Sequence, residues 1–253
     1  MMASKNLVCL GIDLAASRRP FTYVVLDDDL RLLVIGQGGL QEVLAFAAGQ
    51  NYAIVAINAP ARLNQGQMAL EENRQQFEPP PPAGRWNDLR QVEYELHLKG
   101  VAIFRTPAQM ANCPEWMQQG FALYQHLHSW GYQPYSEEGA PLQWLEVPAE
   151  AAYWALLGQP PLEARSLEGR LQRQLILYDH GLPVADPMGY FEEITRFRLL
   201  KGSLPLDGIY TPPELNAWVN AYTAWLAATH SQRLQSLGTA EEGSIHLPFF
   251  AEP

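Results

Sequence analysis

Two carboxylates stand near the ends of short apolar runs, where a side chain is well placed to do chemistry. Asp13 ends the run Leu7–Asp13, and Glu146 lies near the end of the alternating run Gln143–Val147, just before Pro148. Runs of this length, bounded by turn signals, are typical of buried strands. Open α/β sheets bind their ligands at the carboxyl ends of such strands. We therefore expect metal-assisted chemistry, with Asp13 as the first ligand and Glu146 as its partner.

The first three predicted strands form an antiparallel meander. The runs are Leu7–Asp13, Thr22–Leu26 and Arg31–Ile35, and the polar turn Asp27–Asp29 joins the second run to the third. Each run has the length of an ordinary strand and is too short for a core helix. We expect a sheet to begin with these strands.

A helix and a fourth strand follow the meander. Apolar residues recur at helical spacing over 40–48, and the strongly apolar run 52–57 comes next. A crossover helix between strands three and four places strand four beside strand one. Asn58, directly after this run, should therefore lie next to Asp13. The order strand, strand, strand, helix, strand is that of the first half of a ribonuclease-H-like fold.

The middle of the chain, about 62–141, is interpreted as a large helical insertion that covers the end of the sheet. It contains the proline-rich stretch Glu78–Pro82, which we expect to be a loop. Helical patterns cover Asn87–Leu98 and Pro114–Trp130. We expect residues 1–253 to form a single domain, with a mixed sheet of antiparallel and then parallel strands flanked by helices.

Helices predominate after the fifth strand. On the last of them, Asn216, Asn220 and Thr223 form a narrow polar strip that can aim polar groups along the edge of the sheet. Glu214 lies elsewhere on the helical wheel and is better explained as part of a capping box with Thr211. The predicted helices are Ala149–Leu157, Leu167–Tyr178, Asp186 to about Leu200, and Thr211 to about Thr229.

The composition is that of an acidic globular protein. The chain has 253 residues, of which 47% are hydrophobic and 17% charged, and its net charge is -10. This length suffices for a sizeable core. The acidic balance counts against broad, non-specific binding to nucleic acid, which needs a basic face, but it leaves room for a small basic cleft.

The sequence carries no signal for a membrane or for an oxidising compartment. The run Leu7–Ile12 is too short for a secretory signal peptide, and no run approaches the length of a membrane span. Cys9 and Cys113 fit neither a disulfide framework nor a zinc motif, and Cys9 is expected to be a buried thiol. We therefore expect a cytoplasmic protein with no membrane partner.

Several short motifs, taken in their order, resemble one protein family. This is the domain of unknown function 429 family, an uncharacterised family of predicted ribonuclease-H-like nucleases. The resemblance spans nearly the whole chain, and it implies a mixed sheet flanked by helices and two-metal hydrolysis of phosphodiester bonds. The metal would be Mg²⁺ or Mn²⁺, with Asp13 and Glu146 as ligands. The motifs are Gly11–Ala15, Ile57–Pro60, Arg90–Glu93, Thr106–Pro107, Trp116–Met117, Gly131–Tyr132, Glu146–Pro148, Leu167–Arg170 and Glu241–Ile245.

This chain departs from the family pattern at two positions. Asn58 and Asn216 stand where members of the family usually carry Asp. Two divalent ions about 3.5–4 Å apart need several carboxylates to offset their repulsion, and an amide keeps an oxygen ligand but no charge. Because Mg²⁺ prefers anionic oxygens, each change should weaken its binding. Two acids and two amides can hold one ion with several waters better than a pair of ions.

Arginines are the candidates for contact with a substrate. Arg18 and Arg19 would meet a phosphate near the site, or they are simply solvated. Arg170 and Arg173 would contact a substrate strand, or they belong to a salt-bridged helix face. Arg90 matches a family position and is expected to form, with Glu93, an ion pair that lines the cleft.

Three functions remain open at this level. The first is a metal-dependent nuclease acting on nucleic acid, with Asp13, Glu146, Asn58 and Asn216 as catalytic residues. The second is a catalytically reduced ribonuclease-H-like protein that binds a nucleic acid, a nucleotide or a protein partner without hydrolysis. The third is an actin-like nucleotide hydrolase, but Gly11–Ala15 resembles only its first phosphate loop, and no second glycine-rich loop follows strand four.

Overall fold

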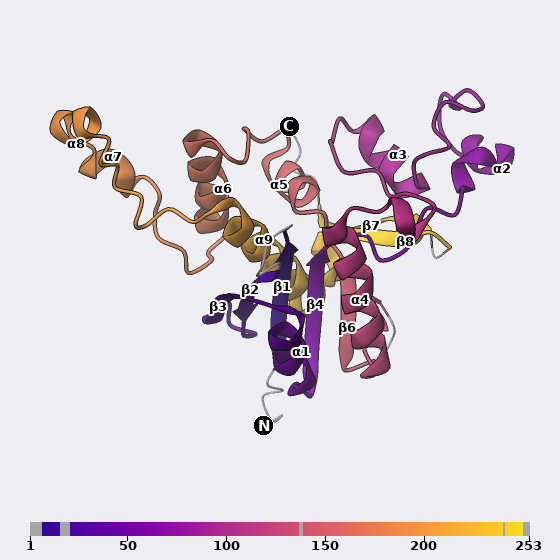
Figure 1. Cartoon of the computed structure of the whole chain (residues 1–253), viewed down its shortest axis with the longest axis horizontal. Coiled ribbons are helices and arrows are strands. Elements are labelled where there is room, and N and C mark those ends of the chain that lie inside the picture. Colours follow the sequence, from indigo (N-terminus) through magenta and orange to yellow (C-terminus); the bar gives the residue numbers. More distant parts are fainter. Residues whose placement is uncertain (1–6, 16–20, 137–138, 240, 250–253) are drawn as a thin grey trace.

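A mixed sheet forms the centre of the computed structural model, which describes residues 7–15, 21–136, 139–239 and 241–249 (Figure 1). The strand order of this eight-stranded sheet is β3-β2-β1-β4-β6-β8-β7, and β5 pairs with β6 off this path. The strands are β1 (Leu7–Leu14), β2 (Phe21–Leu26), β3 (Leu32–Gly38), β4 (Tyr52–Asn58), β5 (Gln133–Pro134), β6 (Leu142–Glu146), β7 (Leu234–Thr239) and β8 (Gly243–Pro248).

The sheet is antiparallel at its two margins and parallel in the middle. β1, β2 and β3 form an antiparallel meander, β4 runs parallel to β1, and β6 runs parallel to β4. β8 is parallel to β6 and pairs with β7 as an antiparallel hairpin. The predicted meander, the place of strand four beside strand one, and the mixed α/β class are thereby confirmed.

Helices cover both faces of the sheet. The core on one face includes α5 and α9, and the core on the other includes α1 and α4. The helices are α1 (Leu40–Ala48), α2 (Glu71–Arg74), α3 (Gln91–Leu98), α4 (Glu115–Ser129), α5 (Ala149–Leu157), α6 (Leu167–Asp179), α7 (Gly189–Glu193), α8 (Arg196–Lys201) and α9 (Pro212–Thr229). Short 3-10 turns lie at Gln67–Ala69, Met110–Asn112 and Ser231–Arg233.

The long helix α9 lies directly on β1. Side chains alternate between the faces of a strand, and Cys9 belongs to the core that includes α9. Gly11 has the same parity, and a Cβ atom added there would lie 2.1 Å from the carbonyl oxygen of Ala217 and 2.1 Å from the amide nitrogen of Ala221. The absence of a side chain at Gly11 is therefore what allows the two backbones to approach.

The chain departs from the local predictions at a few elements. The helix predicted from Asp186 to about Leu200 is wrong, since the structure has two short helices, α7 and α8, with Thr195 between them. The Thr195 hydroxyl accepts a hydrogen bond from the amide of Arg198 and so begins a new helix. The sequence pattern also does not predict β5, which has two residues, or β7, where Gly238 has φ of 88°.

The segment 62–141 contributes to the sheet as well as to its surroundings. It supplies α4 to the core on one face, and β5 pairs with β6. The interpretation of this segment as an insertion that covers the end of the sheet stays a prediction. None of the helices in the described part of the chain combines the length and the apolar character that crossing a membrane requires.

We predict that Gly11→Ala lowers the free energy of unfolding by about 3 kcal/mol or more, because the new methyl group meets helix backbone that cannot move aside locally. Urea unfolding followed by circular dichroism measures the change. Gly189→Ala is the control, since nothing lies within 4 Å of its added Cβ, and its effect should stay within about 1 kcal/mol of zero. Equal stability of the two variants would contradict the close packing of α9 on β1.

Candidate functional site

The carboxyl ends of β1, β4 and β6 meet at one edge of the sheet. Asp13 pairs in register with Asn58. Both side chains therefore project from the face of the sheet that α9 covers. Glu146 pairs with Ile57, one residue earlier on β4. Ile57 belongs to the core with α1 and α4, so Glu146 leaves the sheet on that opposite face. The two acids therefore lie at the same edge of the sheet but project from opposite faces.

Asp13 is almost completely buried and is held by two amides. Its Oδ1 accepts a hydrogen bond from Asn58 Nδ2 at 2.6 Å and another from Asn216 Nδ2 at 3.2 Å. Asn58 is fixed in turn, because its Oδ1 accepts the amide N–H of Ala149 at 3.1 Å. The expected neighbourhood of Asp13 and Asn58 is confirmed. Of the predicted polar strip of α9, Asn216 reaches Asp13 at the sheet edge, whereas the Thr223 hydroxyl donates to the carbonyl of Val219 in its own helix.

The environment of Asp13 favours its protonated form. Burial raises the pKa of the carboxyl to about 7, although the hydrogen bonds from Asn58 and Asn216 act in the opposite direction. Asn220, one turn further along α9, donates to the backbone carbonyl of Ile12 at 3.1 Å. The last helix therefore fixes both the backbone before Asp13 and its side chain.

Glu146 is paired with a buried guanidinium. Arg90 donates to Oε1 of Glu146 through Nη2 at 2.5 Å and to Oε2 through Nη1 at 3.0 Å. The amide N–H of Ala61 donates to the same Oε2 at 2.8 Å. Arg90 also donates through Nε to Glu93 at 2.9 Å, which is the predicted ion pair. The two carboxylates hold the pKa of the guanidinium above its usual range despite its burial.

Two further buried acids tie the surrounding loops together. Glu93 accepts hydrogen bonds from the amide of Thr106 at 3.0 Å and from its hydroxyl at 2.5 Å, while burial raises the pKa of this carboxyl. Glu242 accepts three backbone N–H groups, from Gln65, Gln67 and Gln91, at 2.8, 3.1 and 2.8 Å. These contacts fix the start of α3, where Arg90 lies, against the hairpin of β7 and β8.

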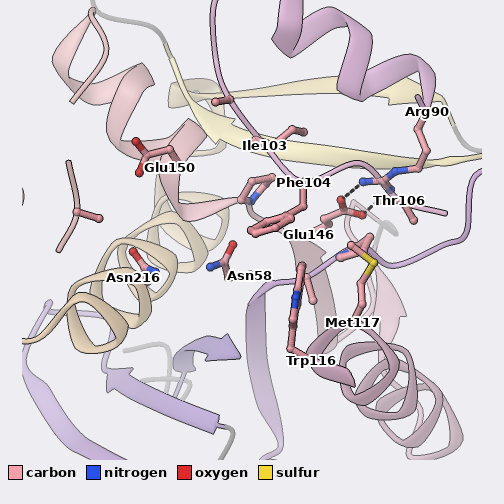
Figure 2. A pocket seen from close by; sticks show the side chains of 15 residues that line it. Asn58, Arg90, Ile103, Phe104, Thr106, Trp116, Met117, Glu146, Glu150 and Asn216 are labelled. Atoms are coloured by element: carbon pink, nitrogen blue, oxygen red, sulfur yellow. Dashed lines mark hydrogen bonds and ion pairs between the residues drawn. The ribbon is translucent and has the colours of Figure 1, made fainter. Parts of the chain in front are cut away.

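A pocket of about 450 Å³ opens over this edge of the sheet. Figure 2 shows Asn58 and Asn216 on one side of it, the Arg90–Glu146 pair on the other, and Phe104 between them. The rings of Phe104 and Trp116 meet edge to face, with centroids 5.3 Å apart. The pocket is lined by Asn58, Ala59, Pro60, Arg90, Ala102, Ile103, Phe104, Thr106, Trp116, Met117, Glu146, Pro148, Glu150, Ala164 and Asn216.

The remaining predicted arginines lie elsewhere. Arg170 donates to the carbonyls of Tyr210 at 2.8 Å and Ile209 at 2.7 Å. Arg173 is fully buried and donates to Glu150 at 2.7 Å. Neither residue lines the pocket. Arg173 forms a salt bridge, as the alternative interpretation expected, whereas Arg170 donates to backbone carbonyls. Arg18 and Arg19 lie outside the described residues.

The donor groups at this edge do not fit a pair of divalent ions. Among the described residues, no group of three or more His, Cys, Asp or Glu side chains is arranged to hold a metal. One oxygen of Asp13 faces two amide N–H donors, and both oxygens of Glu146 already accept hydrogen bonds. A two-ion centre needs several free carboxylate oxygens directed to one point.

Several residues of the pocket were not predicted from the sequence. Phe104 and Glu150 carry no motif. The sequence does contain usable signals, because Thr106–Pro107, Trp116–Met117 and Glu241–Ile245 are among the motifs of the resemblance, and Trp116 and Met117 both line the pocket. Thr106 proves to line the pocket, and Glu242 to anchor its wall.

Comparison with known proteins gives one match. A family model described as "Protein of unknown function (DUF429)" matches residues 11–237. No curated protein and no solved structure matches the chain. The matched range contains Asp13, Asn58, Glu146 and Asn216, whereas Glu242 and β8 lie beyond it.

We predict that Asp13 makes the protein less stable as pH rises from about 5 to 8. The folded-state pKa lies above the unfolded one, so the folded protein holds a proton that the unfolded chain has released, and this advantage disappears above the folded pKa. Denaturant unfolding of the wild type and of Asp13→Asn at each pH measures this loss of stability. Relative to the variant, the wild type should lose about 2–3 kcal/mol between these two pH values.

The matched control for this pH series is Asp207→Asn, which changes an exposed carboxylate in a turn. Its unfolding free energy should follow that of the wild type at every pH. A constant difference between the wild type and Asp13→Asn across the whole series would show that Asp13 titrates normally in the folded protein.

Proposed function

We propose that this chain, which belongs to the DUF429 family of proteins of unknown function, is a catalytically reduced ribonuclease-H-like protein. Its pocket binds a nucleoside. The strand order β3-β2-β1-β4-β6, with its antiparallel meander followed by parallel strands, supports the ribonuclease-H-like part of this proposal. The position of Asp13 and Glu146 at the carboxyl ends of these strands supports the location of the site.

The hydrogen bonding of the two acids supports the reduced activity, and this observation carries the proposal. Asp13 is stabilised by two amide N–H groups and has a pKa of about 7, so near neutral pH much of it is uncharged. Both oxygens of Glu146 accept hydrogen bonds from Arg90, a cation that Glu146 shares with Glu93. The carboxylate oxygens that a divalent ion would need are thus already hydrogen-bonded within the protein.

The pocket walls support a planar organic ligand. A volume of about 450 Å³ is in the usual range for small-molecule sites, which are mostly apolar with a few placed polar groups. Phe104 is 72% exposed at the pocket, and with Trp116 it offers ring surface on which a base can stack. The amides of Asn58 and Asn216 and the carboxylate of Glu150 supply polar partners for the edge of the base.

The charge of the lining supports a nucleoside over a nucleotide polyphosphate. Among the described residues that line the pocket, Arg90 is the one cationic side chain, and it is shared between Glu93 and Glu146. The exposed carboxylate of Glu150 adds negative charge at the mouth, although Arg173 pairs with it from the buried side. A phosphate group would therefore meet no free cation from this lining.

A metal-dependent nuclease is the second candidate function. The observation in its favour is that three adjacent parallel strands deliver Asp13, Asn58 and Glu146 to one edge of the sheet. Magnesium or manganese at this edge would assist the hydrolysis of phosphodiester bonds in nucleic acid. The hydrogen-bonded state of both acids, described above, places this candidate second.

We predict that at least one of the four common ribonucleosides binds and quenches tryptophan fluorescence, and that its triphosphate binds at least tenfold more weakly. Trp116→Leu should weaken nucleoside binding by tenfold or more, because a stacking surface is lost. Trp130→Leu is the control, since Trp130 lies at the other end of α4 and outside the pocket. Absence of binding by all four nucleosides in calorimetry at millimolar concentration would refute the proposal.

We also predict no cleavage of labelled DNA or RNA with Mg²⁺ or Mn²⁺, because the acids of the site are already hydrogen-bonded within the protein. Calorimetry with Mn²⁺ should show no tight two-site binding. Cleavage by the wild type that disappears in Asp13→Asn would establish the nuclease instead. Cleavage that persists unchanged in Asp13→Asn would be assigned to a contaminating enzyme, which a further purification step would remove.

A further inference from the structure

Most hydrogen-bond donors in the lining of the pocket already have partners within the protein. Asn58 and Asn216 each donate through Nδ2 to the carboxylate of Asp13. The hydroxyl of Thr106 and the guanidinium of Arg90 donate to buried glutamates. These contacts fix the donors for the fold, so the groups left for a ligand have to be sought elsewhere on the walls.

Two side-chain oxygens of the lining take part in no hydrogen bond with any described residue. They are Oε1 of Glu150 and Oδ1 of Asn216. Figure 2 shows both residues on the same side of Phe104. A ligand that displaces water from these oxygens must replace the lost hydrogen bonds, because an acceptor left unpaired in a closed site weakens binding. On this side of the pocket the ligand must therefore supply donors.

Glu150 is held in place by a buried cation. Nη2 of the fully buried Arg173 donates to Oε2 of Glu150 at 2.7 Å, while 41% of the Glu150 side chain stays exposed. Nη1 of Arg173 donates to the carbonyls of Leu162 at 2.6 Å and Gly169 at 3.2 Å, and the guanidinium lies over the ring of Tyr153. One oxygen of the carboxylate is thus anchored, and the other is available to a ligand at little cost in side-chain entropy.

The four common bases differ in what they present to a carboxylate. Guanine has two adjacent N–H donors, N1–H and the 2-amino group. Adenine and cytosine place their amino group beside a ring nitrogen that accepts, and uracil places its single N–H between two carbonyl oxygens. An ionised carboxylate only accepts hydrogen bonds, so it can use both oxygens on guanine but meets a lone pair on each of the other bases.

We propose that the pocket selects guanosine over the other common ribonucleosides, with the carboxylate of Glu150 accepting from N1–H and from the 2-amino group. The base stacks on the rings of Phe104 and Trp116, as reading of an unpaired base requires. Glu150 is then the residue that determines specificity, and Arg173 positions it. This inference rests on the proposed function, because it names the nucleoside that the same pocket binds.

A planar cation such as a guanidinium group presents a similar pair of donors but fits this site less well. The charge of Glu150 is already paired with Arg173, so a second cation finds no uncompensated anion there. The rings of Phe104 and Trp116 also offer more surface than a guanidinium covers. Guanine uses both the acceptors and the rings.

The first test compares ligands on the wild-type protein by calorimetry. Guanosine should bind about tenfold or more tightly than adenosine, cytidine and uridine, because a site with a fixed acceptor rejects ligands that lack the matching donor. Inosine keeps N1–H but lacks the 2-amino group, so its affinity should lie between that of guanosine and those of the other three. Arginine amide is the probe for a cationic ligand and should bind more weakly than guanosine.

The second test changes the acceptor. Glu150→Gln keeps an oxygen for Arg173 but replaces the other oxygen with an N–H donor, so it should weaken guanosine binding by about tenfold or more. Glu168→Gln is the matched control, since Glu168 is also the second residue of its helix but is exposed and lies outside the pocket. This variant should bind guanosine like the wild type.

The outcomes separate this inference from the proposed function. If no nucleoside binds to the wild type, the proposed function fails and the inference fails with it. If nucleosides bind but guanosine and inosine bind equally, or another base binds more tightly, the inference alone is wrong. It is also wrong if arginine amide binds more tightly than guanosine, or if Glu150→Gln binds guanosine as well as Glu168→Gln does.

Discussion

The direct packing of α9 on β1 is the constraint on which the site depends. Gly11 allows the helix backbone to approach the strand, and Asn220 then reaches the carbonyl of Ile12. The same placement brings Asn216, one turn earlier, onto the carboxylate of Asp13. An ionised carboxylate closed off from water in this way is unfavourable unless it is hydrogen-bonded, and here the amides compensate only in part. The pKa of about 7 follows from that packing.

This edge of the sheet contains two different solutions to the burial of an acid, at Glu146, which lines the pocket, and at Asp13, which does not. Asp13 relies on amide donors and on partial protonation, whereas Glu146 relies on a guanidinium that holds both of its oxygens. Each solution supplies hydrogen-bond donors to the carboxylate from the protein itself. A buried ion pair of this kind is costly to break, because one partner removed leaves the other unpaired. Arg90 is therefore better explained as the fixed partner of Glu146 and Glu93 than as a group available to a substrate.

Much of the sheet was predictable, because its information is local. The apolar runs predict β1 to β4 and β6, the crossover rule places Asn58 beside Asp13, and the capping box locates the start of α9. The pocket was less predictable, since its parts come from distant segments. Arg90 and Glu146 are separated by 56 residues, and Phe104 lies in a segment without helix or strand, so no periodicity marks either contact.

The relation of the two acids depends on a register that no sequence pattern reveals. Because Glu146 pairs with Ile57 rather than with Asn58, it leaves the sheet on the face opposite to Asp13. The next residue, Val147, has the parity of Asp13 and is buried in the core with α9. An acid at position 147 would therefore point to the same side as Asp13, but at the expense of that core. If β6 were shifted by one residue against β4, both acids would project from the same face of the sheet. In the observed register they lie at the same edge but on opposite faces.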